Sequence, residues 1–372
     1  MSGADLDVDG FARLIVGAHQ SSWQARIVRL SPGDYNRFTA YCCEHRIVQS
    51  DTIERQLADL ALVRLPAGSA VERDRFVTDA VAAAGDRAAV GAWAYFPWQA
   101  SVVHLLDRDG FFEVITNRNR EKITRAEQEL LRTKRVGVLG LSVGGESAVT
   151  VAQEHLCGEI VLADFDRLDL SNLNRLQAGV DELGLRKTAI VARRIARIDP
   201  YLKVTVFEDG VTPANLAAFL DGLDLVVEEC DTPPIKHEVR VQAKARGVDV
   251  VYAGDERGFL SVEPYAQWPT LRPFHGVVET PPLPRDGYPT QRAFLKALTA
   301  WLGGWSNISE RTQRSLACVG ETLCGYPQLA SEARYAAGQI GHVARRLLLG
   351  ERLHPFVGNL DLAQYLPAEG PC

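Results

Sequence analysis

The segment 134–187 constrains the fold of this 372-residue chain more than any other part of the sequence. An apolar run, Val136–Leu139, enters the small-residue turn Gly140–Gly145, and a helical segment follows. A second apolar run, Ile160–Ala163, ends in Asp164. This order of strand, glycine turn, helix and strand is half of a nucleotide-binding βαβ unit. The segment therefore predicts a parallel sheet with a nucleotide at the end of its first strand.

The same alternation continues along the chain. Together with the first unit it predicts strands at 136–139, 160–163, 203–207, 225–228 and 248–253, and helices at 145–155, 187–198, 213–220 and 235–246. Strands that alternate with helices form a mostly parallel sheet through right-handed crossovers. We therefore expect a Rossmann-like α/β domain over residues 111–372, with helices on both faces of its sheet.

Residues 1–110 lack this long alternation, and we expect them to form a separate, small α/β extension. The pattern predicts helices at 11–19, 32–45, 51–60 and 75–84, and strands at 24–30, 60–65, 92–97 and 102–106. No catalytic constellation stands out, which favours a structural role or the binding of a substrate or partner. Thr124 and Glu127 have the spacing of a capping box, so a helix should begin near Thr124. Further helices are expected at 291–302 and 328–349.

Charge and hydropathy exclude several classes of protein. The formal net charge is −6, which argues against a nucleic-acid-binding surface. No apolar run reaches 18 residues, so we expect no membrane span. The acidic N-terminus lacks the features of a signal peptide. These features favour a cytoplasmic protein with no nucleic-acid or membrane partner.

The cysteines favour reduced thiols rather than a disulfide framework. Their number is odd, seven, and they have no regular spacing. No C-x-x-C pair occurs, so we expect no zinc. Cys318 and Cys324 are either a redox or thioester pair or ordinary small core residues.

The turn after the first strand has the composition of a phosphate-binding loop. Gly140, Ser142, Gly144 and Gly145 allow backbone N–H groups at the start of a helix to approach an anion, which the helix dipole favours. Val143 fits least well, wherever the turn demands a positive φ angle. We expect phosphates at this turn.

Two aspartates follow the second strand. Asp164 lies 19 residues past Gly145, where a carboxylate meets ribose hydroxyls in nucleotide-binding folds. A helix-capping role is the alternative for Asp164. Asp166, two residues later, is either a second nucleotide contact or a turn aspartate.

A polar cluster then adds positive charge at fixed spacing. It comprises Asn172, Arg175 and Lys187. ATP carries about four negative charges, and transfer of AMP develops further charge on the pyrophosphate, which Arg and Lys neutralise. A solvated basic face would explain each residue alone. Their joint spacing favours a triphosphate site.

These motifs together resemble the ThiF/MoeB/HesA superfamily, the adenylating relatives of ubiquitin-activating enzymes. The resemblance covers about residues 116–265 and rests on Asn119-Arg120, GLSVGG, DFD, SNLNR, Arg186-Lys187 and Glu229-Cys230-Asp231. The strings FPW, NRNREKITRAEQ and VVEECDTP are similar to a bacterial subgroup that is sometimes fused to nitroreductase-like domains. The resemblance implies ATP as the nucleotide.

The resemblance also implies roles for single residues. Arg175 and Lys187 would hold phosphates, and Asp231 would coordinate Mg²⁺, with Glu229 as the alternative because this chain is one residue shorter than the family pattern. Arg120 would reach into the site of a partner subunit. A homodimer would then be required for activity.

The function implied is ATP-dependent adenylation of a substrate carboxylate, giving an acyl-AMP and pyrophosphate. The carboxylate could belong to a peptide, to the C-terminus of a carrier protein or to a small acid. An NAD- or FAD-binding oxidoreductase on the same βαβ unit is one alternative, but it does not explain the pairing of Arg175 with Lys187. A non-catalytic scaffold is the other, and the altered glycine turn is its best support.

Overall fold

In the computed structural model, which describes residues 5–17, 22–277, 280–302 and 304–366, the chain forms two compact units. The first comprises Met1–Gln128 and Ala192–Lys203, and the second comprises Glu129–Val191 and Val204–Cys372. The division falls within helix α8 (Lys187–Ile198). Each unit has its own sheet.

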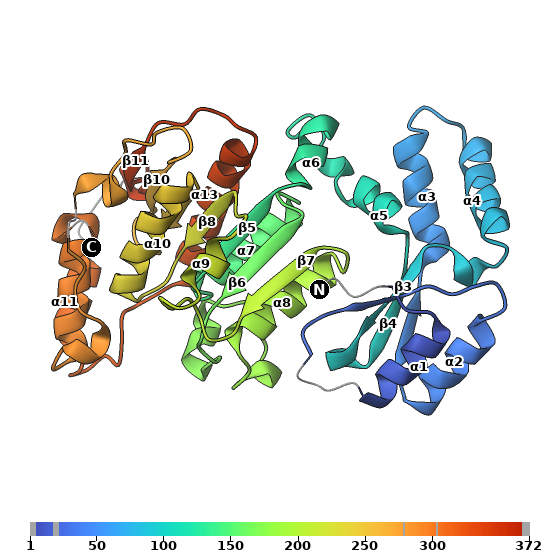
Figure 1. The fold of residues 1–372 in the computed structure, drawn as a ribbon, viewed down its shortest axis with the longest axis horizontal. Coiled ribbons are helices and arrows are strands. Elements are labelled where there is room, and N and C mark those ends of the chain that lie inside the picture. Colours follow the sequence, from blue (N-terminus) through green and yellow to red (C-terminus); the bar gives the residue numbers. More distant parts are fainter. Residues whose placement is uncertain (1–4, 18–21, 278–279, 303, 367–372) are drawn as a thin grey trace. The chain divides into compact units, whose positions relative to one another are not determined.

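The first unit is an α/β fold built on a four-stranded sheet in the order β1-β3-β4-β2 (Figure 1). The β2 and β4 strands run parallel, and the other pairs are antiparallel. The strands are β1 (Arg26–Val28), β2 (Val48–Asp51), β3 (Ala92–Phe96) and β4 (Ser101–Leu105), and the helices are α1 (Val8–Gly17), α2 (Tyr35–Glu44), α3 (Ile53–Arg64), α4 (Ala70–Ala84), α5 (Arg108–Ile115) and α6 (Arg125–Leu131).

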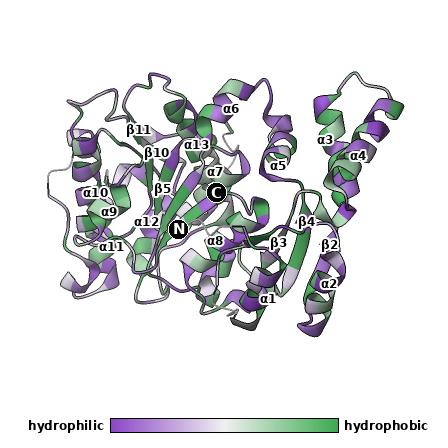
Figure 2. Ribbon diagram, turned by 45° about the vertical axis from the view of Figure 1, so that its right-hand side comes forward, coloured by the Kyte–Doolittle hydropathy of each residue, from purple (hydrophilic) through white to green (hydrophobic). Residues whose placement is uncertain are grey.

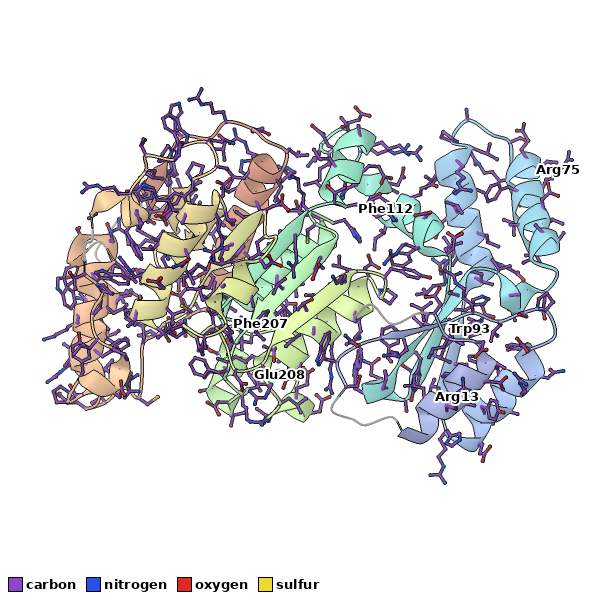
Figure 3. All side chains as sticks on the ribbon, viewed as in Figure 1. Arg13, Arg75, Trp93, Phe112, Phe207 and Glu208 are labelled. Carbon is purple, nitrogen blue, oxygen red and sulfur yellow. The ribbon has the colours of Figure 1, made fainter. Side chains whose placement is uncertain are left out.

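Aromatic side chains form the core of this sheet. Trp93, labelled in Figure 3, is fully buried and packs against Phe38 of α2 at a ring distance of 5.1 Å. On β4, His104 stacks on the same indole ring at 4.2 Å. The Nδ1 of His104 lies 3.0 Å from a carboxylate oxygen of Asp51 at the end of β2. A polar contact between β4 and the end of β2 thus lies at the border of an otherwise apolar core.

The strand expected at 60–65 is wrong, because α3 continues to Arg64. The buried residues of α3 are Ile53, Leu57, Leu60 and Ala61, at helical spacing, whereas Leu62 is 49% exposed. A short apolar run does not distinguish a strand from the last turn of a helix. The helix expected near Thr124 is confirmed: α6 begins at the next residue, with both hydrogen bonds of the capping box in place.

The second unit contains a seven-stranded sheet in the order β11-β10-β9-β8-β5-β6-β7 (Figure 1). Its strands are β5 (Arg135–Leu139), β6 (Glu159–Ala163), β7 (Lys203–Phe207), β8 (Leu225–Glu228), β9 (Asp249–Ala253), β10 (Phe259–Glu263) and β11 (Phe356–Asn359). The pairs β5–β6, β5–β8 and β8–β9 are parallel, while β9–β10 and β10–β11 are antiparallel. The predicted mostly parallel sheet is confirmed, and the antiparallel edge was not foreseen.

Helices cover both faces of this sheet, as predicted. They are α7 (Val143–Gln153), the start of α8, α9 (Leu216–Leu220), α10 (Pro233–Arg246) and α13 (Ala330–Leu348). The second unit also contains α11 (Gln291–Trp301) and α12 (Glu310–Cys318), which pack against each other. On one face, Val226 of β8 packs in a cluster with Phe219 of α9 and Val239 of α10. On the other face, α7 and α13 pack against each other and against β8. In Figure 2 the strand β5 is drawn largely in the hydrophobic colour, as this two-sided burial requires.

Candidate active site

The site begins at the turn between β5 and α7. Gly140 has a φ angle of +83°, and its N–H donates to the carbonyl of Ala163 at 2.9 Å. A Cβ atom at this position would lie 2.5 Å from the carbonyl oxygen of Glu229 and 2.7 Å from the nitrogen of Cys230. Only glycine fits such a position. The turn is therefore packed directly onto the residues that follow β8.

The remaining turn residues lie in or beside the first turn of α7. Val143 is the first helical residue, so the positive φ angle that we considered for it is not required. A Cβ atom on Gly144 would meet the side chain of Glu229 at 3.2 Å, and one on Gly145 would meet Val191 at 3.1 Å. Ser142 precedes the helix, and its Oγ accepts a hydrogen bond from Arg175 Nε at 3.4 Å. Close packing explains the small residues at 144 and 145.

Asp164 fixes the shape of this turn. Its Oδ2 accepts the N–H of Leu141 at 2.6 Å, and its Oδ1 accepts the N–H of Asp166 at 2.7 Å. The side chain is buried, which raises its pKa, although nearby Lys187 opposes that shift. Each carboxylate oxygen has a second lone pair. Asp164 can therefore accept a ligand hydroxyl while it holds the turn.

Lys187, from the predicted basic cluster, forms an ion pair with Asp166, from the pair of aspartates that follows β6. It is only 7% exposed, and its Nζ donates to Asp166 Oδ2 at 2.7 Å. Asp166 is half exposed, so this ammonium has one carboxylate partner at the border with solvent. The neighbouring Arg186 points elsewhere: its NH1 donates to the carbonyl of Glu208, which is labelled in Figure 3 beyond the end of β7. Lys187 and Arg186 thus have different surroundings despite their adjacency.

Asn172 and Arg175 belong to a short 3₁₀ segment and its end. Asn172 is buried, and its Oδ1 accepts the N–H of Asp169 at 3.0 Å, which stabilises the segment. The guanidinium of Arg175 donates to Asn174 Oδ1 at 2.9 Å. Burial lowers the pKa of Arg175, and the charge of two carboxylates, on residues 231 and 255, opposes this. Arg175 therefore lies near both the turn 140–145 and the acidic residues that follow β8 and β9.

Asp231 and Glu229 follow β8 with different orientations. Glu229 Oε1 accepts the N–H of Ala253 at 3.1 Å, and burial raises its pKa well above its usual range. This carboxyl is held within the sheet edge. Asp231 reaches solvent, and the surrounding protein raises its pKa despite the attraction of Lys236 and Lys187. Of the two, Asp231 is the residue available to a ligand.

Asp255 is a member of the site that sequence reasoning missed. Burial and the charge of Asp231 raise its pKa to about 6, and its Oδ2 accepts a hydrogen bond from Gln328 Nε2 at 2.6 Å. In the parallel pair β8–β9, Val227 is in register with Val251, so Asp231 and Asp255 each lie four residues beyond that pair. The rule that selected Asp231, a carboxylate after a core strand, would also have found Asp255.

Glu228 faces away from this group. It is fully buried, its Oε2 accepts a hydrogen bond from Lys236 Nζ at 2.8 Å, and it also binds Arg240. Burial alone would raise the pKa of Glu228, but these two cations lower it by more, so the net shift of the pKa is downward. Its Oε1 accepts the N–H of Cys230 at 2.9 Å. This ion group anchors the segment that carries Asp231 onto α10.

The described part of the chain contains no group of three or more His, Cys, Asp or Glu side chains arranged to hold a metal ion. Mg²⁺ commonly takes one or two protein carboxylates, with phosphate oxygens and water completing its shell. Asp231 and Asp255 fit that requirement only when a phosphate ligand is present. Among the described helices, none is long and apolar enough to cross a membrane.

Arg120 and the cysteines Cys318 and Cys324 were also singled out from the sequence. Arg120 belongs to the first unit, whereas the other predicted site residues belong to the second. Cys318 is half-buried and Cys324 is exposed, so the core role considered for Cys324 is wrong.

Comparison with known proteins identifies the domain that carries the site. Residues 116–267 match the ThiF family. They form a ThiF family domain. The chain is 43% identical over 277 residues to an uncharacterized protein of Mycobacterium tuberculosis, and the alignment covers 74% of this chain and 38% of that protein. It is 28% identical over 144 residues to the adenylyltransferase and sulfurtransferase UBA4 of Yarrowia lipolytica, covering 38% of this chain and 36% of the relative. The chain thus spans well under half the length of these two relatives.

Among solved structures, the chain resembles Escherichia coli tRNA N6-threonylcarbamoyladenosine dehydratase in complex with AMP. The sequence identity is 20% and the TM-score is 0.48, over 66% of this chain and 98% of that one.

Proposed function

We propose that the ThiF domain binds ATP and transfers AMP to a substrate carboxylate. One observation carries the proposal: the buried Lys187 ammonium and the Arg175 guanidinium accompany the N-terminal turn of α7, at the carboxyl ends of the parallel strands. Cations and helix N–H groups in such a position favour an anionic ligand of several charges. The name of the Yarrowia relative, an adenylyltransferase, supports the same reading.

In this proposal the substrate carboxylate attacks the α-phosphate of ATP, and pyrophosphate leaves. The carboxylate is already a nucleophile, so positioning and charge stabilisation do most of the work. Lys187 and Arg175 neutralise the charge that develops on the leaving group. Asp231, with Asp255 beside it, would hold a Mg²⁺ ion, which supplies further positive charge at the phosphates.

The substrate proposed is a peptide, the C-terminus of a carrier protein or a small acid. A homodimer completes the site in this proposal, with Arg120 reaching the partner's nucleotide as the family resemblance implies. An arginine suits that task because its planar fork binds two phosphate oxygens.

Two measurements test the proposal against its alternatives. An oxidoreductase would be stabilised against heat by NAD or FAD, whereas an adenylating enzyme would be stabilised by Mg·ATP. Exchange of labelled pyrophosphate into ATP, dependent on a pool of peptides with free C-termini, would exclude a non-catalytic scaffold. Stabilisation by NAD and not by Mg·ATP would overturn the proposal.

A further inference from the structure

The first unit contains a hollow of which the proposed function uses only Arg120. It has a volume of about 470 Å³ and is lined by Val63, Arg64, Pro66, Glu113, Arg120 and Arg125. All six residues belong to the first unit, so the hollow is complete within one part of the chain. Its volume lies within the range of small-ligand sites.

Charge in this hollow is unbalanced. Three arginines face one carboxylate, Glu113, in a protein whose formal net charge is −6. Arg64 lowers the pKa of Glu113 most, and Arg125 and Arg120 lower it further. Concave surfaces lined by one sign of charge focus the field on a ligand of the opposite sign. The hollow therefore favours anions.

One of the arginines already displays the contact that such a ligand would make. The fork of Arg64 grips Glu113 through two hydrogen bonds, with Nε to Oε2 at 3.1 Å and NH2 to Oε1 at 2.7 Å. Among the described residues, the side chains of Arg120 and Arg125 form no hydrogen bond or ion pair, and both residues are exposed. Two guanidinium groups are thus available beside one that is occupied.

The wall of the hollow is fixed before any ligand arrives. Arg73 donates hydrogen bonds from Nε to the carbonyl of Leu65 at 3.1 Å and from NH2 to the carbonyl of Pro66 at 2.9 Å. A capping box between Ser69 and Glu72 starts α4 directly after this turn. A pre-ordered wall reduces the entropy lost on binding.

We propose that this hollow binds a ligand with two or more negative charges on carboxylate or phosphate oxygens, held by Arg120 and Arg125 next to the Arg64–Glu113 pair. Paired guanidinium forks recognise both kinds of oxygen in this way. The inference assigns Arg120 to its own subunit, so it competes with the role proposed for Arg120 at the partner's nucleotide, and mixing Arg120→Ala with Lys187→Ala distinguishes the two roles. Anion binding in the hollow does not depend on nucleotide binding by the ThiF domain.

The test is calorimetric titration of the full chain without Mg²⁺, at low salt, with citrate, pyrophosphate and a peptide of four aspartates as separate probes. Each is titrated into the wild type and into Arg125→Ala, Arg120→Ala/Arg125→Ala, Glu113→Gln and Lys187→Ala. Arg118→Ala is the matched control, because it removes the same charge from the same segment at an exposed residue outside the lining. The probe that binds most tightly identifies the source of the ligand.

We expect affinity to fall about fivefold in Arg125→Ala, further in the double variant and less than twofold in Arg118→Ala, and to rise in Glu113→Gln. A loss of fold cannot produce that rise. The proposal is overturned if no probe binds, if Arg118→Ala weakens binding as much as Arg125→Ala, or if Glu113→Gln leaves the affinity unchanged. Binding lost only in Lys187→Ala would assign the anion to the ThiF domain and also reject the hollow.

Discussion

Carboxylates beside arginines in the first unit and carboxylates at the candidate site of the second unit have opposite pKa shifts. In the first unit, Asp51 and Glu113 have arginine partners, and their pKa values are lowered. In the second, the pKa values of Asp231 and Glu229 are raised, and that of Asp255 is raised to about 6, because desolvation and nearby carboxylates disfavour their ionised forms. A carboxylate with a raised pKa contributes unfavourably to stability when it is ionised.

This difference separates a scaffold from a site. Paired carboxylates stabilise the fold at neutral pH, and they need no ligand. Crowded carboxylates beside a buried lysine leave charge that a cation and a phosphate can balance, and perturbed groups of this kind gather at functional sites. At the candidate site of the ThiF domain the ionised carboxylates therefore reduce the stability of the fold, whereas Asp51 and Glu113 of the first unit increase it.

Replacing glycines in the two units should sharpen the comparison most. Gly140→Ala would force a Cβ atom onto the backbone of Glu229, so we expect a loss of about 3 kcal/mol or more in unfolding free energy. Gly33→Ala, at a φ angle of +89° with no atom within 4 Å, should cause only the strain of about 1–2 kcal/mol. Thermal and urea unfolding measure both. Equal losses would show that the Gly140 turn is not crowded.

Removing a single charge from the acidic site should separate binding from catalysis. Asp231→Asn should bind nucleotide but lose pyrophosphate exchange on the order of 100-fold, because the variant no longer holds Mg²⁺ at the phosphates. Asp209→Asn, at a side chain that is 89% exposed, is the control and should keep full exchange. Normal exchange in Asp231→Asn would transfer the metal role to Glu229 or Asp255.

Mixing two inactive variants should show whether Arg120 of one subunit completes the nucleotide site of the other subunit. If Arg120 completes the partner's site, a mixed dimer of Arg120→Ala and Lys187→Ala has one site with both lesions and one with neither. Random mixing should then restore about a quarter of wild-type exchange. If Arg120 serves only its own subunit, every site keeps a lesion and mixing restores nothing. Active monomers in light scattering would also contradict the dimer.

The opposite pKa shifts predict opposite pH dependence. Burial raises the pKa of Asp51, but the Ile53 N–H, Arg87 and His104 lower it more, so its stabilisation is present above about pH 4 and is lost as the pH falls. Burial raises the pKa of Asp249 to about 6, so its ionisation costs stability as the pH rises from about 4 to 6.

Unfolding temperatures measured between pH 3.5 and 7 should show both signs. Asp51→Asn should lose about 1–2 kcal/mol of unfolding free energy at pH 7 and less at pH 3.5, because the ion pair with Arg87 disappears. As the pH rises from 4 to 7, the unfolding free energy of Asp249→Asn should increase relative to that of the wild type by about 2 kcal/mol. The amide oxygen of the Asn side chain can still accept the Ala266 N–H. Parallel pH curves for wild type and variants would remove the contrast between the units.

The central parallel strands could be predicted from the sequence, whereas the edge strands β2 and β11 could not. Strands β5, β6, β8 and β9 are apolar runs that are mostly buried, and each begins within one residue of its predicted start. The edge strand β7 was also predicted, although it is only partly buried. The edge strand β2 has Val48 66% exposed, and Phe356 and Val357 of β11 are 38% and 47% exposed. A strand without a buried face carries no alternating signal.

The candidate site was predictable in its residue types but not in its contacts. Spacing selected Asp164 and Lys187, which lie at the ends of elements. It did not reveal that Asp164 holds the Leu141 N–H, or that Lys187 is paired with Asp166, because these contacts depend on strands brought together in space. Asp255 follows β9 as Asp231 follows β8, so the rule that selected Asp231 would have found it, and only its place beside Asp231 depends on the register of the two strands.

Calorimetric titration of Mg·ATP into the wild type, Lys187→Ala and Arg186→Ala tests the central claim most directly. The two variants remove adjacent positive charges, but only Lys187 is buried beside Asp166, whereas Arg186 contacts Glu208 at the end of β7. We predict that the wild type binds Mg·ATP more tightly than NAD, that Lys187→Ala weakens Mg·ATP binding at least about tenfold, and that Arg186→Ala changes it less than twofold. Unchanged affinity for Mg·ATP in Lys187→Ala would contradict the account.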